Sequence, residues 1–298
     1  MSRMSVVTGP MRLPFVVLAP ICVFLGIATA YSAGADFPVL QAILAVFGGI
    51  FAHISVNAFN EYADFWSGLD FKTTKTPFSG GSGTLPENPE EYGSALFIAW
   101  LSFSLTVGIG IYFIWLRGWI LVPLGVVGAV MVLGYSKWFT KNPLLCLISP
   151  GIGFGTIMVI GTHVVLAGSY SVSAMVASLV PFFLVSNLLL LNQFPDMEAD
   201  REVGRRHYPT LIGRPKSAWL YISFLALAYL AIIGGVVFFV FPMWALLGLL
   251  TVPLAVAAGR GAVKFADDTK AIVPYLIMNV LINLLTPLLM AVGIFIAK

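Results

Sequence analysis

Charged side chains are scarce in this chain of 298 residues. Asp, Glu, Lys and Arg make up 10% of it, whereas they form about a quarter of an average soluble domain. Hydrophobic residues make up 59%, and the mean hydropathy is +0.96. This composition excludes a water-soluble globular enzyme and indicates a polytopic, all-helical protein surrounded by membrane lipids. No nucleic-acid partner is expected.

Cysteine is nearly absent as well. Cys22 and Cys146 both fall within predicted membrane spans, so we expect neither a disulfide framework nor a thiolate metal site, and we interpret both as small packing residues. A cleavable signal peptide is also not evident. Residues 1–12 lead directly into an apolar run without a small-residue cleavage pattern, so the first helix is expected to remain in the protein.

Long apolar runs, by contrast, are abundant. A helix needs about 20 mostly apolar residues to cross a bilayer, and the chain contains about nine such runs. They cover residues 13–33, 37–59, 94–115, 119–135, 143–167, 173–193, 218–241, 243–258 and 272–297. The eighth run is short and follows a tight turn at Phe241 and Pro242. We predict a single membrane domain over residues 1–298.

Lys and Arg residues predict the orientation of this domain. With a cytoplasmic N-terminus, all 16 Lys and Arg residues except Arg117 and Lys298 lie on the cytoplasmic side, as positive-inside topology requires. An error of one span would remove this segregation. We therefore expect an integral protein of the cell membrane with a cytoplasmic N-terminus.

The stretch 53–91 carries the first concentration of polar residues. On a helix, His53, Asn57, Asn60 and Asp64 fall on one face. Glu61, Asp70 and the bases Lys72 and Lys75 accompany them. This face is a polar stripe that emerges from an otherwise apolar helix.

A second stretch, residues 192–214, repeats the Asn-x-x-x-Asp opening of the first. Asn192, Asp196 and Asp200 stand four residues apart and line one helix face, with Glu198 and Glu202 beside them. The two stretches end the second and the sixth span. Two similar four-helix halves, at about residues 13–135 and 143–258 with a ninth helix at 272–297, would bring them face to face across a central cavity.

Carboxylate and amide oxygens on neighbouring helix ends suit Mg²⁺, which completes its coordination with water and substrate phosphate. Arg201, Arg205, Arg206, Lys137, Lys141, Lys72 and Lys75 lie near the acids, and such bases bind phosphate oxygens. We expect Lys72 and Arg201 to contact the substrate because they adjoin the acids. Alternatively, the acids are ordinary solvated helix ends, and the bases only reflect the topology.

Three further features leave alternatives open. The loop 77–91, with Ser79-Gly-Gly-Ser-Gly83 at its centre, is either a flexible connection or a lid that approaches phosphate. His163 has no polar partner on its face and is expected to be a hydrogen-bonded core residue. Asn279 and Asn283 in the ninth span either line the cavity or bond another helix.

The motifs Asn60-Glu-Tyr-Ala-Asp64-Phe-Trp-Ser-Gly-Leu-Asp70 and Asn192-Gln-Phe-Pro-Asp196-Met-Glu-Ala-Asp200, together with Tyr135-Ser136-Lys137, resemble those of UbiA-type intramembrane prenyltransferases. The similarity is greatest to the menaquinone-type branch, which prenylates dihydroxynaphthoate, and it extends over nearly the whole chain. It implies a helical bundle with a central cavity, Mg²⁺ on the diphosphate of an isoprenoid donor, and a lateral opening to lipid.

The chain departs from this family at two positions and in two segments. Position 68 is Gly, so the third acid of the first motif is Asp70, and position 61 is Glu where many relatives have Asp. The segments 137–147 and 151–155 differ from the menaquinone-type pattern. These segments are expected near the acceptor, so the donor chemistry is better defined than the acceptor.

We therefore expect Mg²⁺-dependent transfer of a prenyl group from an allylic polyprenyl diphosphate to an aromatic or other lipophilic, electron-rich acceptor. Asp70 or Glu61 is expected to orient or deprotonate the acceptor. The expected catalytic residues are Asp64, Asp70, Lys72, Asp196, Asp200 and Arg201. The expected metal ligands are Asn60, Asp64, Asp70, Asn192, Asp196 and Asp200, and the expected substrate-binding residues are His53, Asn57, Asn60, Glu61, Tyr135, Lys141 and Asn192.

A membrane transporter with an acidic ion site is the alternative function. Transporters place such acids near the bilayer midplane, whereas these acids lie beside Lys and Arg at one predicted face. A phosphatidyl-type transferase is a further alternative, but its Asp-Gly-x-x-Ala-Arg pattern is not found in the sequence.

Overall fold

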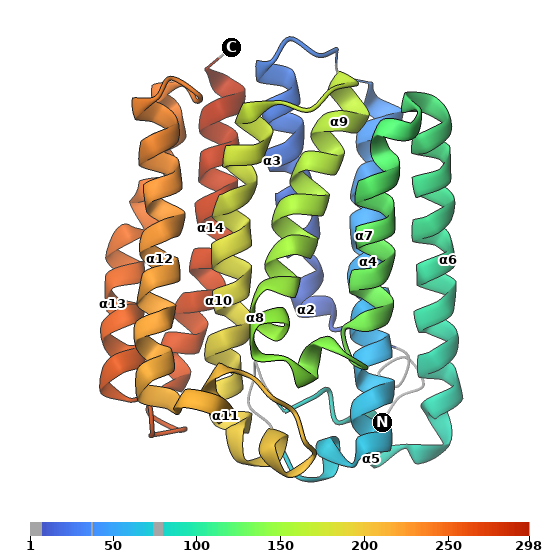
Figure 1. Ribbon diagram of the computed structural model, residues 1–298, viewed down its shortest axis with the longest axis vertical. Coiled ribbons are helices and arrows are strands. Elements are labelled where there is room, and N and C mark those ends of the chain that lie inside the picture. The colour runs from blue at the N-terminus through green and yellow to red at the C-terminus, as the bar shows by residue number, and fades with distance from the viewer. Residues whose placement is uncertain (1–7, 37, 74–79, 298) are drawn as a thin grey trace.

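The computed structural model describes residues 8–36, 38–73 and 80–297. Every regular element within these residues is a helix, and the long helices run side by side as one bundle (Figure 1). Seven helical stretches are long and apolar enough to cross a membrane. The predicted all-helical membrane fold is therefore confirmed for the part of the chain that the structure describes.

Four of the seven stretches are single helices: α4 (Val39–Ser67), α10 (Val172–Glu202), α12 (Arg214–Val237) and α14 (Val273–Ile296). Three are composite: η2 (Pro89–Glu91) with α6 (Tyr92–Arg117), α8 (Pro143–Gly151) with η5 (Ile152–Ile160) and α9 (Gly161–Ala167), and η6 (Met243–Thr251) with α13 (Val252–Lys264). The predicted eighth span at 243–258 is thus helical, and its helix continues to Lys264.

The count of nine spans is not confirmed. At the predicted first and fourth spans the structure has shorter apolar helices, Leu18–Ser32 and Trp119–Gly134. The first is α3, which follows the one-turn helix α2 (Leu13–Val16), and the second combines η3 (Trp119–Leu121) with α7 (Val122–Gly134). Pro20 and Pro123 lie in the first turns of α3 and α7. Proline is tolerated there because those N–H groups have no partner within the helix.

The fifth span changes its helical type midway. Pro150 lies inside α8 and lacks an N–H, and the wider π-helix η5 follows at once. Gly151 and Gly155 let this segment press against α10, since an added Cβ would lie 2.3 Å from the Phe182 carbonyl oxygen and 2.5 Å from that of Ser178. The span therefore packs closely against the long helix α10.

The main core lies among α3, α10, α12 and α14. Polar side chains join these helices inside it. The Tyr221 hydroxyl donates to Asn279 Oδ1 at 3.1 Å, and Asn279 Nδ2 donates to the Asn187 carbonyl at 3.3 Å. Asn283 bonds the Asn279 carbonyl one turn away. Of the two alternatives for Asn279, the structure thus shows the bond between helices. His163 bonds Thr29 at 3.0 Å, as expected of a core residue.

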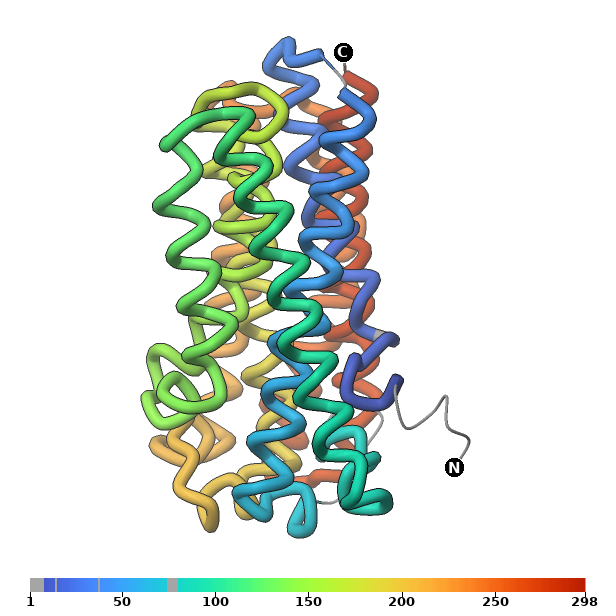
Figure 2. The backbone as a smooth tube through the Cα atoms, turned by 90° about the vertical axis from the view of Figure 1, so that its right-hand side faces the viewer, coloured from blue at the N-terminus to red at the C-terminus, as the bar shows by residue number. Residues whose placement is uncertain are grey.

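The ends of α4 and α10 that carry the two acidic stretches lie at the same end of the bundle, beside α5 (Thr84–Glu87) and α11 (Tyr208–Ile212) (Figure 1). The tube view in Figure 2 places the turns η1 (Leu69–Phe71), η2 (Pro89–Glu91) and η4 (Phe139–Lys141) around the same end. The connection from α9 to α10 and the last turn of α14 lie at the opposite end (Figure 1). All the motif residues are thus gathered at one end.

Candidate active site

Helix α4 presents the predicted polar face to an internal cavity. His53, Asn57, Asn60 and Asp64 all line it. Asn57 Nδ2 donates to the His53 carbonyl at 2.8 Å, and Asn60 Nδ2 donates to Asp64 Oδ2 at 2.7 Å. The periodicity of the sequence therefore predicted this face correctly.

Gly68 ends α4 and fixes the position of Asp70. Its φ of +77° is left-handed, which glycine adopts readily, and its N–H bonds the carbonyls of the last turn. Asp70 consequently lies in η1, beyond the helix, as the shift of the third acid by two positions predicts. Burial raises the pKa of Asp70 to about 8, and the nearby charges of Glu61 and Asp64 contribute. One of its oxygens, Oδ2, is buried and has no hydrogen-bond partner in the structure.

Helix α10 supplies the second polar face. Asn192, Asp196 and Asp200 line the same cavity. The side-chain oxygen of Asn192 is buried and has no hydrogen-bond partner among the described residues, and Asp200 Oδ2 lies 2.9 Å from His207 Nε2. The four-residue spacing thus predicted correctly that these side chains share one helix face.

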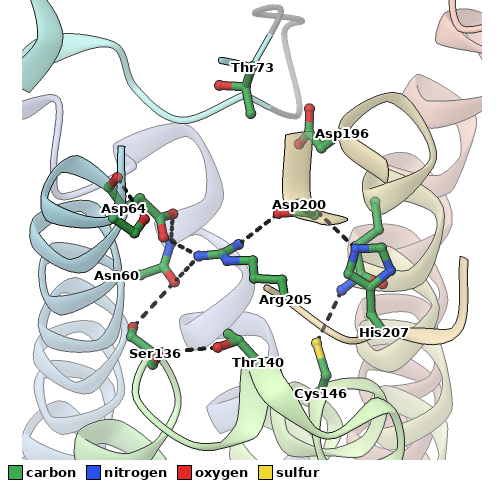
Figure 3. Close-up of polar contacts among 12 residues, drawn as sticks. Asn60, Asp64, Thr73, Ser136, Thr140, Cys146, Asp196, Asp200, Arg205 and His207 are labelled. Carbon is green, nitrogen blue, oxygen red and sulfur yellow. Dashed lines mark hydrogen bonds and ion pairs between the residues drawn. The ribbon is translucent and has the colours of Figure 1, made fainter. Parts of the chain in front are cut away.

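Arg205 joins the two motifs. Its guanidinium forms an ion pair with Asp64 of α4, and its Nη1 lies 3.4 Å from Asp200 Oδ1 of α10 (Figure 3). Nη2 also donates to Asn60 Oδ1 at 3.4 Å, and Ser136 donates to the same oxygen at 3.3 Å. The prediction that the two stretches face each other is therefore confirmed. Burial lowers the pKa of Arg205, but the charges of Asp64 and Asp200 outweigh it and raise this pKa overall.

The loop after η1 covers the acids. The Gly80 N–H donates to Asp196 Oδ2 at 3.0 Å, and the Ser82 N–H donates to Glu61 Oε2 at 3.2 Å. Gly81 has a φ of +73°, and an added Cβ would lie 2.5 Å from Asp70 Oδ1. Residues 80–82 thus contact acids of both motifs, which favours the binding-loop interpretation. Ser79 and Lys75 lie outside the described residues.

The cavity has a volume of about 620 Å³ and two chemically different parts. Its polar end, here called the mouth, is lined by the carboxylates, the amides and Arg205. The rest of the cavity is walled by apolar residues of α6, α7, η5 and α9, among them Phe103, Phe113, Leu124, Phe154 and Val165. The arrangement fits a ligand with a charged head and a hydrocarbon tail.

A model of the UbiA prenyltransferase family matches residues 18–283. The chain belongs to the UbiA prenyltransferase family. It is therefore an integral membrane enzyme of the prenyltransferase class, and the family resemblance of its motifs is confirmed.

Curated relatives in this family are similar at modest identity. A 1,4-dihydroxy-2-naphthoate octaprenyltransferase of Bacillus subtilis (strain 168) is 27% identical over 225 residues, which cover 74% of this chain and 70% of that protein. The UbiA prenyltransferase domain-containing protein 1 of Xenopus tropicalis is 27% identical over 283 residues, or 92% of this chain and 77% of that protein.

Solved UbiA structures share the fold. A UbiA homologue from Aeropyrum pernix K1, in its apo form, superposes with a TM-score of 0.71 at 17% identity, covering 96% of this chain and 98% of that one. A UbiA homologue from Archaeoglobus fulgidus bound to GPP and Mg²⁺ superposes with a TM-score of 0.61 at 13% identity, covering 97% and 99%.

Four predicted residues of this UbiA-family chain lie away from the cavity wall. Lys72 pairs with Glu202 at 2.8 Å on the surface, and Arg201, also exposed, donates to the Thr210 carbonyl at 3.4 Å. Lys141 is exposed, and Glu61 is buried behind the wall against Ser82. The structure thus brings the acids and amides together but does not bring Lys72, Arg201 and Lys141 to them. Tyr135 does line the cavity.

Sequence reasoning did not single out Arg205 or His207. Both follow Gly204, whose φ of +79° turns the chain back after α10. His207 Nε2 then reaches Asp200, and the side chain of Arg205 reaches Asp64. A glycine just beyond the last helical residue is a helix-ending signal, and it was the available indication that the following residues return toward the acids.

The donor set fits Mg²⁺. Its polar atoms are carboxylate and amide oxygens, which hard cations prefer. Asp70 Oδ2 and Asn192 Oδ1 are buried oxygens that bond to no other residue in the part of the chain that the structure describes. Among the described residues, no group of three or more His, Cys, Asp or Glu side chains is arranged to hold a metal ion by itself. Mg²⁺ commonly retains waters and takes substrate phosphate oxygens, so such a site would be completed by its substrate.

Proposed function

We propose that this enzyme transfers a prenyl group from an allylic polyprenyl diphosphate to an electron-rich aromatic acceptor within the membrane, in a Mg²⁺-dependent reaction. The observation that carries this proposal is the cavity, in which the acids of both motifs form the mouth of an apolar interior. An acidic mouth alone would repel a diphosphate. Together with Mg²⁺ and Arg205, it provides a site for a polyanion whose tail lies in the apolar part.

The residues have separate roles in this proposal. Asp64, Asp70, Asp196 and Asp200, with the amides of Asn60 and Asn192, would hold Mg²⁺. When bound, Mg²⁺ supplies positive charge that stabilises the diphosphate as a leaving group. The backbone N–H of Gly80, 3.0 Å from Asp196, places a donor beside the same position.

The proposed reaction is an electrophilic alkylation. The allylic C–O bond breaks, and its electron pair leaves with the diphosphate. The resulting allylic carbocation forms a C–C bond with a carbon of the acceptor, which then loses a proton. The apolar walls exclude water, which would otherwise capture the cation. Phe103, Phe113 and Phe154 are among the residues that line the cavity, and aromatic rings stabilise a cation that approaches their faces.

Dihydroxynaphthoate is the first acceptor to test. The similarity to the Bacillus subtilis dihydroxynaphthoate octaprenyltransferase supports it. A hydroxylated aromatic ring is rich in electrons and suits capture of a carbocation. His53 and Asn57 lie on the α4 face deeper than Asp64, and His53 contacts the Phe154 ring edge-on at 5.8 Å between centroids. We assign the acceptor to this region.

The test measures transfer by the purified enzyme. Geranyl or octaprenyl diphosphate is incubated with dihydroxynaphthoate and MgCl₂, and pyrophosphate and prenylated product are followed. We expect turnover that EDTA abolishes, and a loss of about a hundredfold or more in Asp64→Asn and Asp196→Asn. Glu202→Gln, which removes an exposed ion pair on the same helix as Asp196, should retain turnover. Full Mg²⁺-dependent activity in either Asp variant would refute the assignment.

The transporter alternative is not favoured. The family is one of prenyltransferases, and the acids lie at one end of the bundle (Figure 1), whereas transporters bind ions near the midplane. We further propose that the acidic mouth and the N-terminus face the cytoplasm, as the Lys and Arg distribution indicates.

A further inference from the structure

Arg205 forms ion pairs with acids of both motifs. It pairs with Asp64 on one side and with Asp200 on the other, as Figure 3 shows. The Arg205 side chain is 21% exposed, and those of Asp64 and Asp200 are 7% and 4% exposed. The contact therefore lies inside the mouth of the cavity and differs from the exposed pair of Lys72 with Glu202.

The backbone holds Arg205 in this place. The Arg205 N–H donates to the Asp200 carbonyl at 2.9 Å, and the Arg206 N–H donates to the Thr140 carbonyl at 2.8 Å. Gly204, with its left-handed φ, makes this reversal possible. These hydrogen bonds fix the backbone of the segment to α10 and to η4. An exchange of ionic partners by Arg205 therefore requires only its side chain to move.

The positive charge of Arg205 suits two sets of anionic partners: the carboxylates of Asp64 and Asp200, and the phosphate oxygens of a bound diphosphate. Two carboxylates that face each other in a poorly hydrated site repel, and a buried guanidinium compensates them. Asp64 and Asp200 are also proposed Mg²⁺ ligands. An oxygen that is paired with Arg205 is blocked for a metal ion, so the pairing and the loaded site compete. The planar guanidinium also matches phosphate oxygens, which are present in the loaded site.

We propose that Arg205 is a displaceable counter-ion, which pairs with Asp64 and Asp200 in the unloaded enzyme and donates to the diphosphate when the acids bind Mg²⁺. This inference rests on the proposed function, because it assigns the diphosphate as the second partner. It replaces Lys72 and Arg201 by Arg205 as the base that stabilises the leaving group. It also predicts that Arg205 opposes metal binding while it assists the reaction.

The experiment uses Arg205→Gln in the full-length protein. Its Tm is measured against MgCl₂ concentration, with and without geranyl diphosphate, and turnover is measured separately. We expect a lower Tm without Mg²⁺, because two facing carboxylates lose their counter-ion. The half-saturating Mg²⁺ concentration should fall about threefold or more, since the competitor is gone. The value of kcat should fall roughly tenfold to a hundredfold, since the leaving group loses a donor.

Arg206→Gln is the matched control. Arg206 is the next residue, has the same charge and is exposed, so it should leave the Mg²⁺ titration and kcat unchanged. Arg205→Lys, which keeps a positive charge, should restore part of the Tm. A purely structural Arg205 would lower the Tm without moving the Mg²⁺ midpoint, and that result, or a higher midpoint, overturns the proposal.

Failure of the proposed function gives a different result. In that case the wild-type enzyme shows no Mg²⁺-dependent transfer with any donor. The Mg²⁺ titration of the Tm, with and without geranyl diphosphate, does not depend on turnover and still decides whether Arg205 and the metal compete.

Discussion

Gly81 lies in the loop that contacts the acids, directly beside Asp70. An added Cβ would lie 2.5 Å from Asp70 Oδ1, and the φ of +73° is unfavourable for any other residue. We expect Gly81→Ala to displace Asp70 or the loop and to lower kcat/KM for the donor roughly tenfold to a hundredfold. Steady-state kinetics at saturating Mg²⁺ measures this change.

Gly168→Ala is the control for backbone strain. Gly168 has a φ of +77° and lies at the opposite end of the bundle, where an added Cβ would meet nothing closer than 3.7 Å. Both variants should lose about 1 kcal/mol of stability from the left-handed conformation, but Gly168→Ala should keep its turnover. Equal activity in the two variants would show that the loop contact has no catalytic importance.

At the level of single residues, the acids were predictable and the base was not. The spacing of Asn60 and Asp64, and of Asn192, Asp196 and Asp200, identifies faces because a helix repeats every 3.6 residues. Gly68 likewise predicted that Asp70 lies beyond the helix. Arg201 is nearest in sequence to Asp200, but it points to the surface, whereas Arg205 returns after Gly204. Proximity in sequence therefore did not identify the base that contacts the acids, because the turn at Gly204 decides the direction of the chain.

Helix α6 shows how one element shapes the apolar part of the cavity. Gly108 and Gly110 both have open space around an added Cβ, but only Gly110 lines the cavity, while Gly108 is exposed. We expect Gly110→Phe to occupy space used by the donor tail. Its kcat/KM should fall about tenfold for geranylgeranyl diphosphate and little for dimethylallyl diphosphate.

Gly108→Phe is the matched variant on the same helix, two residues away. It adds the same ring to the outer face of α6 and should leave both donors unaffected. An equal loss with the short and the long donor in Gly110→Phe would show that this wall does not contact the tail.

The contact between α12 and α14 depends on a hydrogen bond inside the core. Tyr221→Phe removes the donor to Asn279 Oδ1 and should lower the free energy of unfolding by about 0.6–1.5 kcal/mol. Turnover should not change, because neither residue lines the cavity. Thermal unfolding in detergent provides the measurement, and Tyr170→Phe, which removes an exposed bond to the Ile120 carbonyl, provides the control. A loss of activity at an unchanged Tm would contradict this interpretation.

At the level of elements, hydropathy predicted where the helices lie but not their internal form. The π-helix η5 and the 3₁₀ segment η6 are both strongly apolar, as membrane-spanning α-helices are. For η5, the change of helical type follows Pro150 and accompanies close packing against α10, and neither is apparent from hydropathy. The short α3 and α7 begin at prolines that a window of 20 residues averages out. Hydropathy therefore predicted the helical class correctly, whereas the count of nine spans is not confirmed.

The orientation of the whole molecule is open to direct measurement. Thr269 and Ser169 are exposed, and they lie in the connections from α13 to α14 and from α9 to α10. Figure 1 shows the first connection at the acidic end of the bundle and the second at the opposite end. With the proposed topology, an impermeant thiol reagent should label Ser169→Cys from the outside of intact cells and Thr269→Cys only in inverted vesicles. Cys22 and Cys146 are buried, so the unsubstituted protein gives the background. The reverse pattern would place the active-site mouth outside.

The division into two four-helix halves stays a prediction at this scale. It correctly led to the facing of the two motifs, which Arg205 demonstrates by contacting both. The positions of the remaining helices depend on packing among α3, α10, α12 and α14. Helices with similar apolar surfaces pack against one another with little selectivity. The sequence therefore did not predict which of these helices are neighbours.

The contrast between the charged mouth and the hydrocarbon interior also affects the products. In the proposed reaction, pyrophosphate is highly soluble in water, whereas the alkylated ring is more lipophilic than its precursor. The first therefore partitions into the aqueous phase at the acidic end, and the second partitions into the bilayer. Pyrophosphate and the prenylated product therefore separate into water and lipid as they form. Because they no longer meet in one phase, the reverse reaction is disfavoured by mass action.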